Sequence, residues 1–406
     1  MAVCLTNLTL TPKVRIQTVI WVKVLSKHMT PYLATDEGDL YLGDNIEILR
    51  ELPEQSVQTV MTSPPYWGLR DYGTADWEGG DEDCEHTITH DNDAKNPDAD
   101  RPFRGDRSKC LKCDAKRVDL QVGLENTPEA YIESLVELFR EVRRVLKDDG
   151  TVWLNLGDTY WGGKGKSGMI DSSLQAKRTN TLNKSHHNDT GGKGKTRPQD
   201  YKHTTFKPKD LCLMPHRVAI ALQEDGWLVR NDIIWEKPNC MPSSAKDRLT
   251  VSHEYIFLLA KQKKYYYDQD AVREPYTTPM NRWGGTTLKA DGESTWDEGT
   301  GQSTYRNRSM RPNPKGRNRR TVWKIPTKSY KGAHFAVFPE ALVEPCVLAG
   351  APEGGIVLDP FVGSGTVPLV AIKNNRKFIG IDLNEEYLKL AVKRLEDSKP
   401  LLDAKV

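Results

Sequence analysis

The chain of 406 residues lacks an apolar run long enough to cross a membrane. The longest apolar stretch near its start, Val19 to Leu25, contains Lys23, whereas a membrane-spanning helix needs about 20 mostly apolar residues. A secretory signal is not expected either, because Arg15 and Lys23 lie around that stretch and no small-residue cleavage site follows it. We therefore predict a cytoplasmic protein with no membrane partner.

Cysteine and net charge are also sparse. Seven cysteines in a cytoplasmic chain of this length do not suggest a disulfide framework, so we expect their thiols to be reduced or bound to metal. The net charge is only +2, but the charges are unevenly distributed. Residues 71–106 hold twelve acidic and three basic residues, and residues 301–331 hold ten basic and no acidic ones. The basic block favours a polyanion-binding face, with a solvated basic loop as the alternative.

Strand and helix patterns alternate along most of the chain, in which 37% of residues are apolar. Buried strands are predicted at 40–43, 57–62, 151–156, 227–235, 255–259, 356–358 and 378–381. Helices are predicted at 45–52, 127–150, before Gly226, at 339–349, after the strand at 356–358 and after Asn384. This alternation indicates an α/β fold with a mostly parallel sheet, helices on both faces, and ligands at the carboxyl ends of the strands.

One glycine-rich turn follows a predicted strand and opens a helix. Its sequence is Asp359-Pro360-Phe361-Val362-Gly363-Ser364-Gly365-Thr366. Glycines let the backbone approach a ligand, and the helix N-terminus offers free N–H groups. Asp382 ends the next strand, where a carboxylate can accept hydrogen bonds from both ribose hydroxyls of a nucleoside. The turn has neither the third glycine of a dinucleotide fingerprint nor a phosphate-loop ending, so the spacing favours an adenosine-containing cofactor over a plain structural turn.

A second motif, Ser63-Pro64-Pro65-Tyr66, follows the predicted strand at 57–62. Two successive prolines make a stiff segment whose carbonyls are not occupied by a regular neighbouring strand ladder. Ser63 and the Pro64 carbonyl are therefore placed to grip an exocyclic amino group. Tyr66 offers a ring face on which a base taken out of a duplex can stack.

Together the two motifs resemble those of the DNA amino-methyltransferases, in the subgroup whose catalytic motif precedes the cofactor motif. Ser63 to Tyr66 matches the family's catalytic Ser/Asp-Pro-Pro-Tyr, and Asp359 to Thr366 matches its Asp-Pro-Phe-x-Gly-Ser-Gly-Thr. The segment 335–348, with Phe338, resembles the helix that covers the methionine part of the cofactor. The segment 42–44, with Asp44, resembles the one that contacts the adenine. The resemblance implies S-adenosylmethionine as the cofactor and a Rossmann-like methyltransferase sheet.

The same resemblance implies a circularly permuted strand order. Only one helix follows Asp382, so the strand at 40–43 is expected beside the strand at 378–381. We expect an N-terminal extension before Met29, at 1–28, and a catalytic domain in three parts. These parts are 29–76, 119–274 with a loop insertion at 161–209, and the cofactor-binding part at 321–398. An insertion at 77–118 and a target-recognition region at 275–320 separate them.

Function follows from the resemblance as methyl transfer to the exocyclic amine of a flipped base in DNA. Serine rather than aspartate before Pro-Pro-Tyr favours cytosine N4, with adenine N6 as the alternative. Carbon-5 methylation needs a cysteine nucleophile, but Cys346 falls inside a predicted helix and the motif order is opposite, so we interpret it as a core residue. An inactive DNA-binding regulator or subunit is an alternative of another class, although no catalytic or glycine position departs from the pattern.

The expected partners are double-stranded DNA and a cognate restriction endonuclease. Six arginines of the basic region are candidates for contacts with phosphates or guanine edges: Arg306, Arg308, Arg311, Arg317, Arg319 and Arg320. Phosphate contact is the role expected for most of them, because such contacts predominate in protein–DNA interfaces.

Four soft metal ligands lie in the insertion at 77–118. Cys84-x-His86 and Cys110-x-x-Cys113 stand 23 residues apart in a segment without an apolar core. A structural zinc ion would supply the folding energy that apolar burial cannot supply there. Free surface thiols are the alternative, since the first pair departs from Cys-x-x-Cys, and His90 is an alternative ligand to His86.

Overall fold

The computed structural model describes residues 30–68, 76–81, 83–86, 110, 112–118, 121–125, 127–162, 203–275, 313, 315–327 and 338–403. The predicted extension at 1–28 lies outside the described residues, as does most of the regions 161–209 and 275–320. Within the described part of the chain, no helix combines the length and the apolar composition that a membrane crossing requires.

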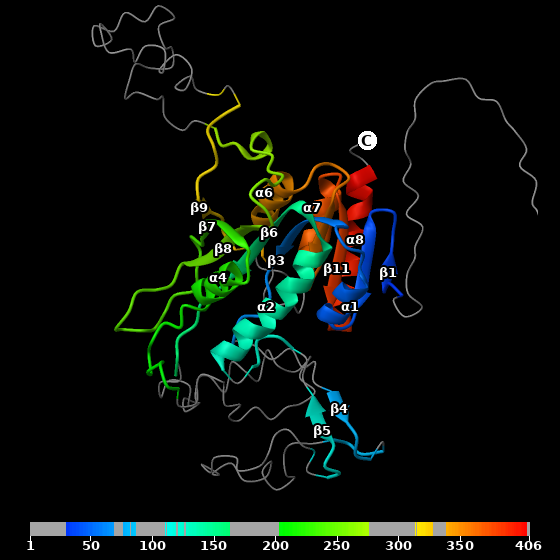
Figure 1. The fold of residues 1–406 in the computed structure, drawn as a ribbon, viewed down its shortest axis with the longest axis vertical. Coiled ribbons are helices and arrows are strands. Elements are labelled where there is room, and N and C mark those ends of the chain that lie inside the picture. The colour runs from blue at the N-terminus through cyan, green and yellow to red at the C-terminus, as the bar shows by residue number, and fades with distance from the viewer. Residues whose placement is uncertain are drawn as a thin grey trace, which may run out of the picture.

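Eleven strands are assigned among the described residues. Their bounds are β1 (Leu33–Ala34), β2 (Gly38–Leu42), β3 (Val57–Thr62), β4 (Asp76–Glu78), β5 (Lys116–Val118), β6 (Leu146–Leu156), β7 (Leu228–Glu236), β8 (His253–Ala260), β9 (Val322–Lys324), β10 (Ile356–Asp359) and β11 (Lys377–Asp382). Nine of them form one sheet in the order β1-β2-β11-β10-β3-β6-β8-β7-β9, and β4 pairs with β5 apart from it (Figure 1). Five of the eight pairings in the large sheet are parallel, so the predicted mostly parallel sheet is confirmed.

The permuted strand order is also confirmed. Strand β2 pairs in parallel with β11, with Tyr41 opposite Ile381 and Leu42 opposite Asp382. The Gly43 N–H then donates to the Asp382 carbonyl (3.0 Å). A strand from the early part of the chain therefore completes the sheet beside β11, the last strand in sequence.

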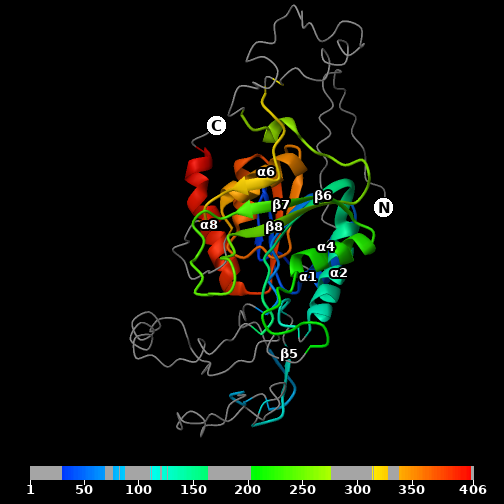
Figure 2. The ribbon, with the colours of Figure 1, turned by 90° about the vertical axis from the view of Figure 1, so that its left-hand side faces the viewer.

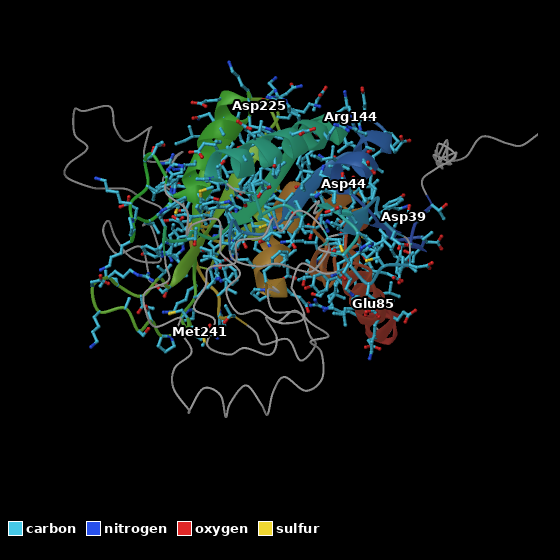
Figure 3. All side chains as sticks on the ribbon, turned by 90° about the horizontal axis from the view of Figure 1, so that it is seen from below. Asp39, Asp44, Glu85, Arg144, Asp225 and Met241 are labelled. Carbon is cyan, nitrogen blue, oxygen red and sulfur yellow. The ribbon has the colours of Figure 1, made fainter. Side chains whose placement is uncertain are left out.

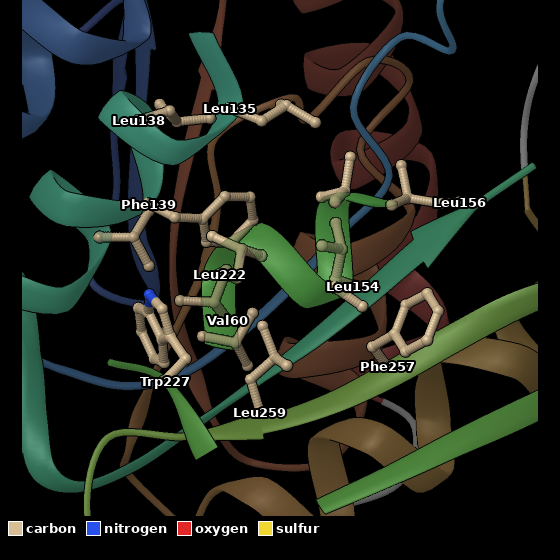
Figure 4. Packing of buried hydrophobic residues seen from close by; sticks show 14 of the residues in the cluster. Val60, Leu135, Leu138, Phe139, Leu154, Leu156, Leu222, Trp227, Phe257 and Leu259 are labelled. Atoms are coloured by element: carbon tan, nitrogen blue, oxygen red, sulfur yellow. The ribbon is translucent and has the colours of Figure 1, made fainter. Parts of the chain in front are cut away.

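Helices cover both faces of the sheet (Figures 1 and 2). One face carries α1 (Asn45–Glu51), α2 (Pro128–Val145) and α4 (Met214–Glu224), and the other carries α6 (Glu340–Gly350), α7 (Thr366–Lys373) and α8 (Glu385–Asp403). A short 3₁₀ helix, η3 (Asp270–Val272), packs near α6. Side chains alternate across each strand, so Val60 of β3 joins the first core and Met61 joins the second. Figure 4 shows Phe139 of α2 and Leu222 of α4 in the first core.

Helix α2 ends before the predicted residue, Gly150. The chain becomes extended at Leu146, which pairs with Val57 of β3 and starts β6. A Cβ at Gly150 would lie 2.9 Å from the carbonyl oxygen of Gln58, so this glycine permits a close approach between strands. The prediction of a helix to Gly150 was therefore wrong, because strand pairing outweighs the local helix-ending pattern.

Candidate active site

Two carboxylates lie at the carboxyl ends of the neighbouring strands β10 and β11. Asp359 is 1% exposed, and its Oδ1 accepts hydrogen bonds from the Thr62 hydroxyl (2.7 Å) and the Phe361 N–H (3.1 Å). Among the described residues, its Oδ2 has no hydrogen-bond partner. Burial, together with the nearby charge of Asp382, raises the pKa of Asp359 to about 7. This oxygen is a buried acceptor that a cofactor donor can satisfy.

Asp382 is held by backbone donors on both sides. Its Oδ2 accepts from the Gly363 N–H and its Oδ1 from the Asn384 N–H, each at 2.8 Å. Burial raises the pKa of this carboxyl to about 6. Each carboxylate oxygen can accept a second hydrogen bond, so the arrangement is compatible with the predicted contact to two ribose hydroxyls.

The glycine turn joins β10 to α7 through two left-handed residues, Gly363 (φ 51°) and Gly365 (φ 76°). A Cβ at Gly365 would lie 2.9 Å from the Cβ of Ala391 on α8, so only glycine fits there. Ser364 and Thr366 are both buried, and the Thr366 hydroxyl accepts from Arg394 (2.8 Å). The glycines thus shape the loop, while the Thr366 hydroxyl fixes α7 to α8.

The remaining predicted cofactor residues lie after β2, before α6 and within the turn itself. Asp44 follows β2, and its Oδ1 caps α1 by accepting from the N–H groups of Ile46 (2.9 Å) and Glu47 (3.0 Å). Figure 3 labels Asp44. Phe338 is half-buried just before α6 and packs against the second core. The neighbouring residues 335–337 lie outside the described residues. Pro360 accepts a long hydrogen bond from Asn45 (3.5 Å), and Phe361 packs against the first core.

The Ser-Pro-Pro-Tyr segment leaves the carboxyl end of β3, between the ends of β10 and β6. Pro64 is buried and Ser63 is partly exposed. The Tyr131 hydroxyl of α2 donates to the Pro65 carbonyl (3.0 Å), whereas no donor to the Pro64 carbonyl is found within the described part of the chain. The Pro64 carbonyl and the Ser63 hydroxyl therefore remain as acceptors at this edge.

The Tyr66 side chain is fixed at its hydroxyl and along its ring. The hydroxyl donates to Glu254 (2.8 Å) and also lies 3.2 Å from Asn155 Oδ1 and 3.4 Å from Ser63 Oγ. Burial and the Glu254 charge raise the pKa of Tyr66 well above its usual range, so the hydroxyl stays protonated. A Cβ at Gly157 would lie 2.5 Å from the Tyr66 ring, so the glycine lets the ring lie against the backbone.

Three residues of this network were missed from the sequence. Glu254 is the second residue of β8, Asn155 lies in β6, and Lys237 follows β7 and pairs with Glu254. Asn155 is 1% exposed within the apolar run 152–156 of β6, and a polar residue in such a run is the signal that would have found it. Glu254 and Lys237 carry no comparable sequence pattern.

The structure describes three of the six arginines predicted to contact DNA. Arg317 and Arg320 both pair with Glu274, at 3.2 and 3.4 Å, and Arg319 lies over the Trp323 ring. The side chain of Arg320 is 67% exposed and that of Arg317 is 25% exposed, so Arg320 is the more accessible of the two to a DNA phosphate. The other three, Arg306, Arg308 and Arg311, lie outside the described residues.

Two other predictions concern cysteines. Cys346 is fully buried in α6, and its Sγ donates to the Leu342 carbonyl (3.4 Å), as expected of a core residue. The ligand atoms of the four residues predicted to hold a metal ion all lie within 4.8 Å of one another: Cys84, His86, Cys110 and Cys113. The structure thus brings together the predicted metal ligands at a place separate from the two carboxylates.

A permuted α/β sheet with a glycine turn and two carboxylates at its carboxyl edge is typical of an S-adenosylmethionine-dependent methyltransferase. Asp359 Oδ2 is buried without a hydrogen-bond donor among the described residues, and Asp382 can accept further hydrogen bonds, so both residues fit that cofactor. A family model described as DNA methylase matches residues 57–393. The chain belongs to this N6/N4 DNA methylase family, and it is a DNA methyltransferase.

Relatives match nearly the whole chain. It is 38% identical to the Type II methyltransferase M.Cfr9I of Citrobacter freundii, over 91% of both chains. It is 40% identical to the Type II methyltransferase M.SmaI of Serratia marcescens, over 88% of this chain and 90% of that one. Among solved structures, the PvuII DNA methyltransferase (cytosine-N4-specific) has a TM-score of 0.51 at 16% identity, and the match covers 93% of this chain and 95% of that one. This structural likeness supports the fold.

Proposed function

We propose that the enzyme methylates the exocyclic N4 of cytosine at a specific site in duplex DNA. The observation that carries this proposal is the hydrogen bond from Thr62 to Asp359 (2.7 Å). Thr62 immediately precedes Ser63, and Asp359 opens the glycine turn, so the bond joins the catalytic motif to the cofactor motif. A base held by Ser63 and Pro64 would lie next to a cofactor held by Asp359 and Asp382.

The chain's own residues make the amine reactive. An exocyclic amine is a poor nucleophile because its lone pair is delocalised into the ring. The Pro64 carbonyl and the Ser63 hydroxyl accept hydrogen bonds from the two N–H groups of the amine. These bonds concentrate the lone pair on nitrogen. Bound S-adenosylmethionine supplies the electrophilic methyl group. Holding two reactants in line contributes on the order of 7 to 11 kcal/mol, so positioning by this rigid segment accounts for much of the rate.

Tyr66 provides a stacking surface whose direction is fixed. Glu254 and Asn155 hold its hydroxyl, and Lys237 pairs with the other Glu254 oxygen. Such a held ring stacks an extruded base without losing side-chain freedom at that moment, and base–aromatic stacking contributes about 1–3 kcal/mol per base. Glu254 is therefore a positioning residue that acts through Tyr66.

Cytosine is favoured because serine occupies the first position of the catalytic motif. The resemblance to the amino-methyltransferases supports cytosine N4 for serine and adenine N6 for aspartate. The relatives M.Cfr9I and M.SmaI are Type II methyltransferases. We propose the same class for this enzyme, which implies a role in a restriction–modification system with a cognate endonuclease as partner.

DNA would approach the carboxyl edge of the sheet, close to the loop between β7 and β8. This loop follows Lys237 and exposes Leu249 (90%) and Met241 (86%) to solvent. Figure 3 shows Met241 at the edge of the molecule. Exposed apolar side chains beside a site for an extruded base suit contact with unstacked base steps. The basic region at 275–320 would then add phosphate contacts.

Product analysis tests this function. The purified enzyme is incubated with mixed-sequence duplex DNA and methyl-labelled S-adenosylmethionine, and the digested nucleosides are identified by mass spectrometry. We expect labelled N4-methylcytosine, and we expect it to be lost in Ser63→Ala but retained in Cys346→Ala, a core variant. Labelled N6-methyladenine would overturn the base assignment. Unlabelled DNA from an enzyme that still binds the cofactor would overturn the catalytic proposal.

A further inference from the structure

A cluster of soft ligands lies outside the active site, in the insertion between the catalytic segment and α2. Cys84 Sγ lies 3.9 Å from Cys110 Sγ, and Cys113 Sγ lies 3.3 Å from His86 Nδ1. A disulfide needs a sulfur–sulfur distance of about 2.05 Å, so the thiols are near one another without being bonded. Three sulfurs and one imidazole nitrogen form the donor set typical of a structural zinc site.

The chain wraps tightly around Cys110. The Cys110 N–H donates to the Ala115 carbonyl (2.7 Å), and the Asp114 N–H donates back to the Cys110 carbonyl (3.0 Å). The Lys112 N–H points at Cys110 Sγ (3.4 Å), and backbone donors of this kind stabilise a metal-bound thiolate. The turn thereby presents Cys110 and Cys113 toward the same point.

Gly80 leaves room for the sulfur of Cys113. Gly80 has a φ of +80°, and a Cβ there would lie 2.7 Å from Cys113 Sγ. Gly80 follows β4, and Cys113 precedes β5. The antiparallel pairing of these two strands therefore brings the two halves of the ligand set together. The glycine is therefore required by the approach of the sulfur as well as by the turn.

Apolar burial does not account for the fold of this insertion. The strands β4 and β5 have three residues each, and neither core cluster of the described residues includes a side chain from 76–118. The hairpin lies away from the large sheet in Figures 1 and 2. A two-stranded hairpin is marginal by itself in water, so another source of stability is needed.

We propose that Cys84, His86, Cys110 and Cys113 bind one zinc ion that stabilises the folded insertion. Four protein ligands close the coordination sphere, so the ion is structural and takes no part in methyl transfer. The insertion leaves the chain after Gly68 and returns at Gly123, where the Gly68 N–H donates to the Gly123 carbonyl (2.8 Å). The folded module thus closes a loop that begins two residues after Tyr66.

Metal content tests the proposal directly. The full-length enzyme is purified without chelators and its zinc is measured by plasma mass spectrometry. We expect one zinc ion per chain, and loss of zinc in both Cys113→Ser and His86→Ala. Cys240→Ser removes a partly exposed thiol outside the cluster and is expected to retain the ion. Cobalt substitution of the wild-type enzyme is expected to give thiolate charge-transfer and tetrahedral d–d bands.

If the variants are insoluble, wild-type enzyme from which a chelator has removed the metal provides the test. Removal of zinc is expected to open the segment 77–118 to limited proteolysis, and added zinc is expected to restore protection. The affinity for S-adenosylmethionine is expected to stay within about twofold, because distant sites behave independently. Wild-type enzyme that holds no zinc and takes up none after thiol reduction would overturn the site. Retention of zinc in both variants would overturn the ligand set. These readouts do not depend on which base is methylated.

Discussion

The cofactor end of the sheet and the catalytic segment are held in different ways. The Asp382 carboxylate accepts hydrogen bonds from the backbone N–H groups of Gly363 and Asn384. These donors lie in the loops that follow β10 and β11. Tyr66 is instead held by the side chains of Asn155 and Glu254, which come from two other strands. The cofactor end therefore depends on loop shape, whereas the catalytic segment depends on the antiparallel part of the sheet being in place.

This difference separates cofactor binding from the chemical step. Backbone donors remain when a distant side chain changes, so we expect Asp382 to be insensitive to substitutions in β8. The hydroxyl of Tyr66 loses its orientation when either side-chain acceptor is removed. Variants on the two sides should accordingly divide into those that change cofactor affinity and those that change turnover.

The largest effect is expected for Asp382→Ala. Hydrogen bonds to charged groups contribute about 1.5–3 kcal/mol each, so losing two contacts to the ribose should weaken S-adenosylmethionine binding by at least about 100-fold. Isothermal titration calorimetry measures this affinity. Asp36→Ala, an exposed residue just before β2, is the matched control and should leave it unchanged. Unchanged affinity in Asp382→Ala would refute the ribose assignment.

The same contrast explains what the sequence revealed. The glycines and Asp382 act through local backbone geometry, so their spacing predicted an adenosine-containing cofactor, and the family resemblance then identified it as S-adenosylmethionine. The strand at 40–43 was correctly placed beside β11 because the order of the two motifs implies a permuted sheet. Glu254 and Lys237 lie far from Tyr66 in sequence, and no local pattern marks their pairing with it. The end of α2 was misjudged for a related reason, since strand pairing at Leu146 decided it.

A smaller effect is expected for Glu254→Gln on the catalytic side. The amide keeps the size of the carboxylate but loses the charge that faces Lys237 and Tyr66. We expect turnover to fall about 10-fold, as for one charge-assisted hydrogen bond, while cofactor affinity stays within about twofold. Single-turnover methylation and calorimetry measure the two quantities.

Glu236→Gln is the matched control for Glu254→Gln. Glu236 lies on the neighbouring strand β7 and pairs with the exposed Lys324 (3.3 Å), so its neutralisation should change neither quantity. If Glu254→Gln lowered cofactor affinity as much as turnover, the proposed separation of the two ends would be wrong. Equal loss in both glutamine variants would indicate a general charge effect instead.

The pH dependence of cofactor binding follows from the buried carboxylates. The pKa values of Asp359 and Asp382, about 7 and about 6, exceed the ordinary aspartate value of 3.8. The folded free enzyme thus holds protons that the unfolded chain has already released, and the stability contributed by these groups falls as pH rises from about 4 to about 7. Cofactor donors need the ionised form. Affinity should therefore increase with pH up to about 7 and then level off.

Thr62→Val gives the smallest effect and tests the link between the two ends. The Thr62 hydroxyl lowers the pKa of Asp359 by donating to Oδ1, so its removal should move the upper inflection of the affinity profile to higher pH. Loss of about 1 kcal/mol from this bond corresponds to at most a fivefold loss of affinity, reached at pH values below the inflection. At higher pH, where Asp359 is ionised in both proteins, the difference should shrink. Calorimetry across this range, with Thr35→Val as a partly buried control, measures it. A uniform loss at every pH would mean that Thr62 supports the strand ends without tuning Asp359.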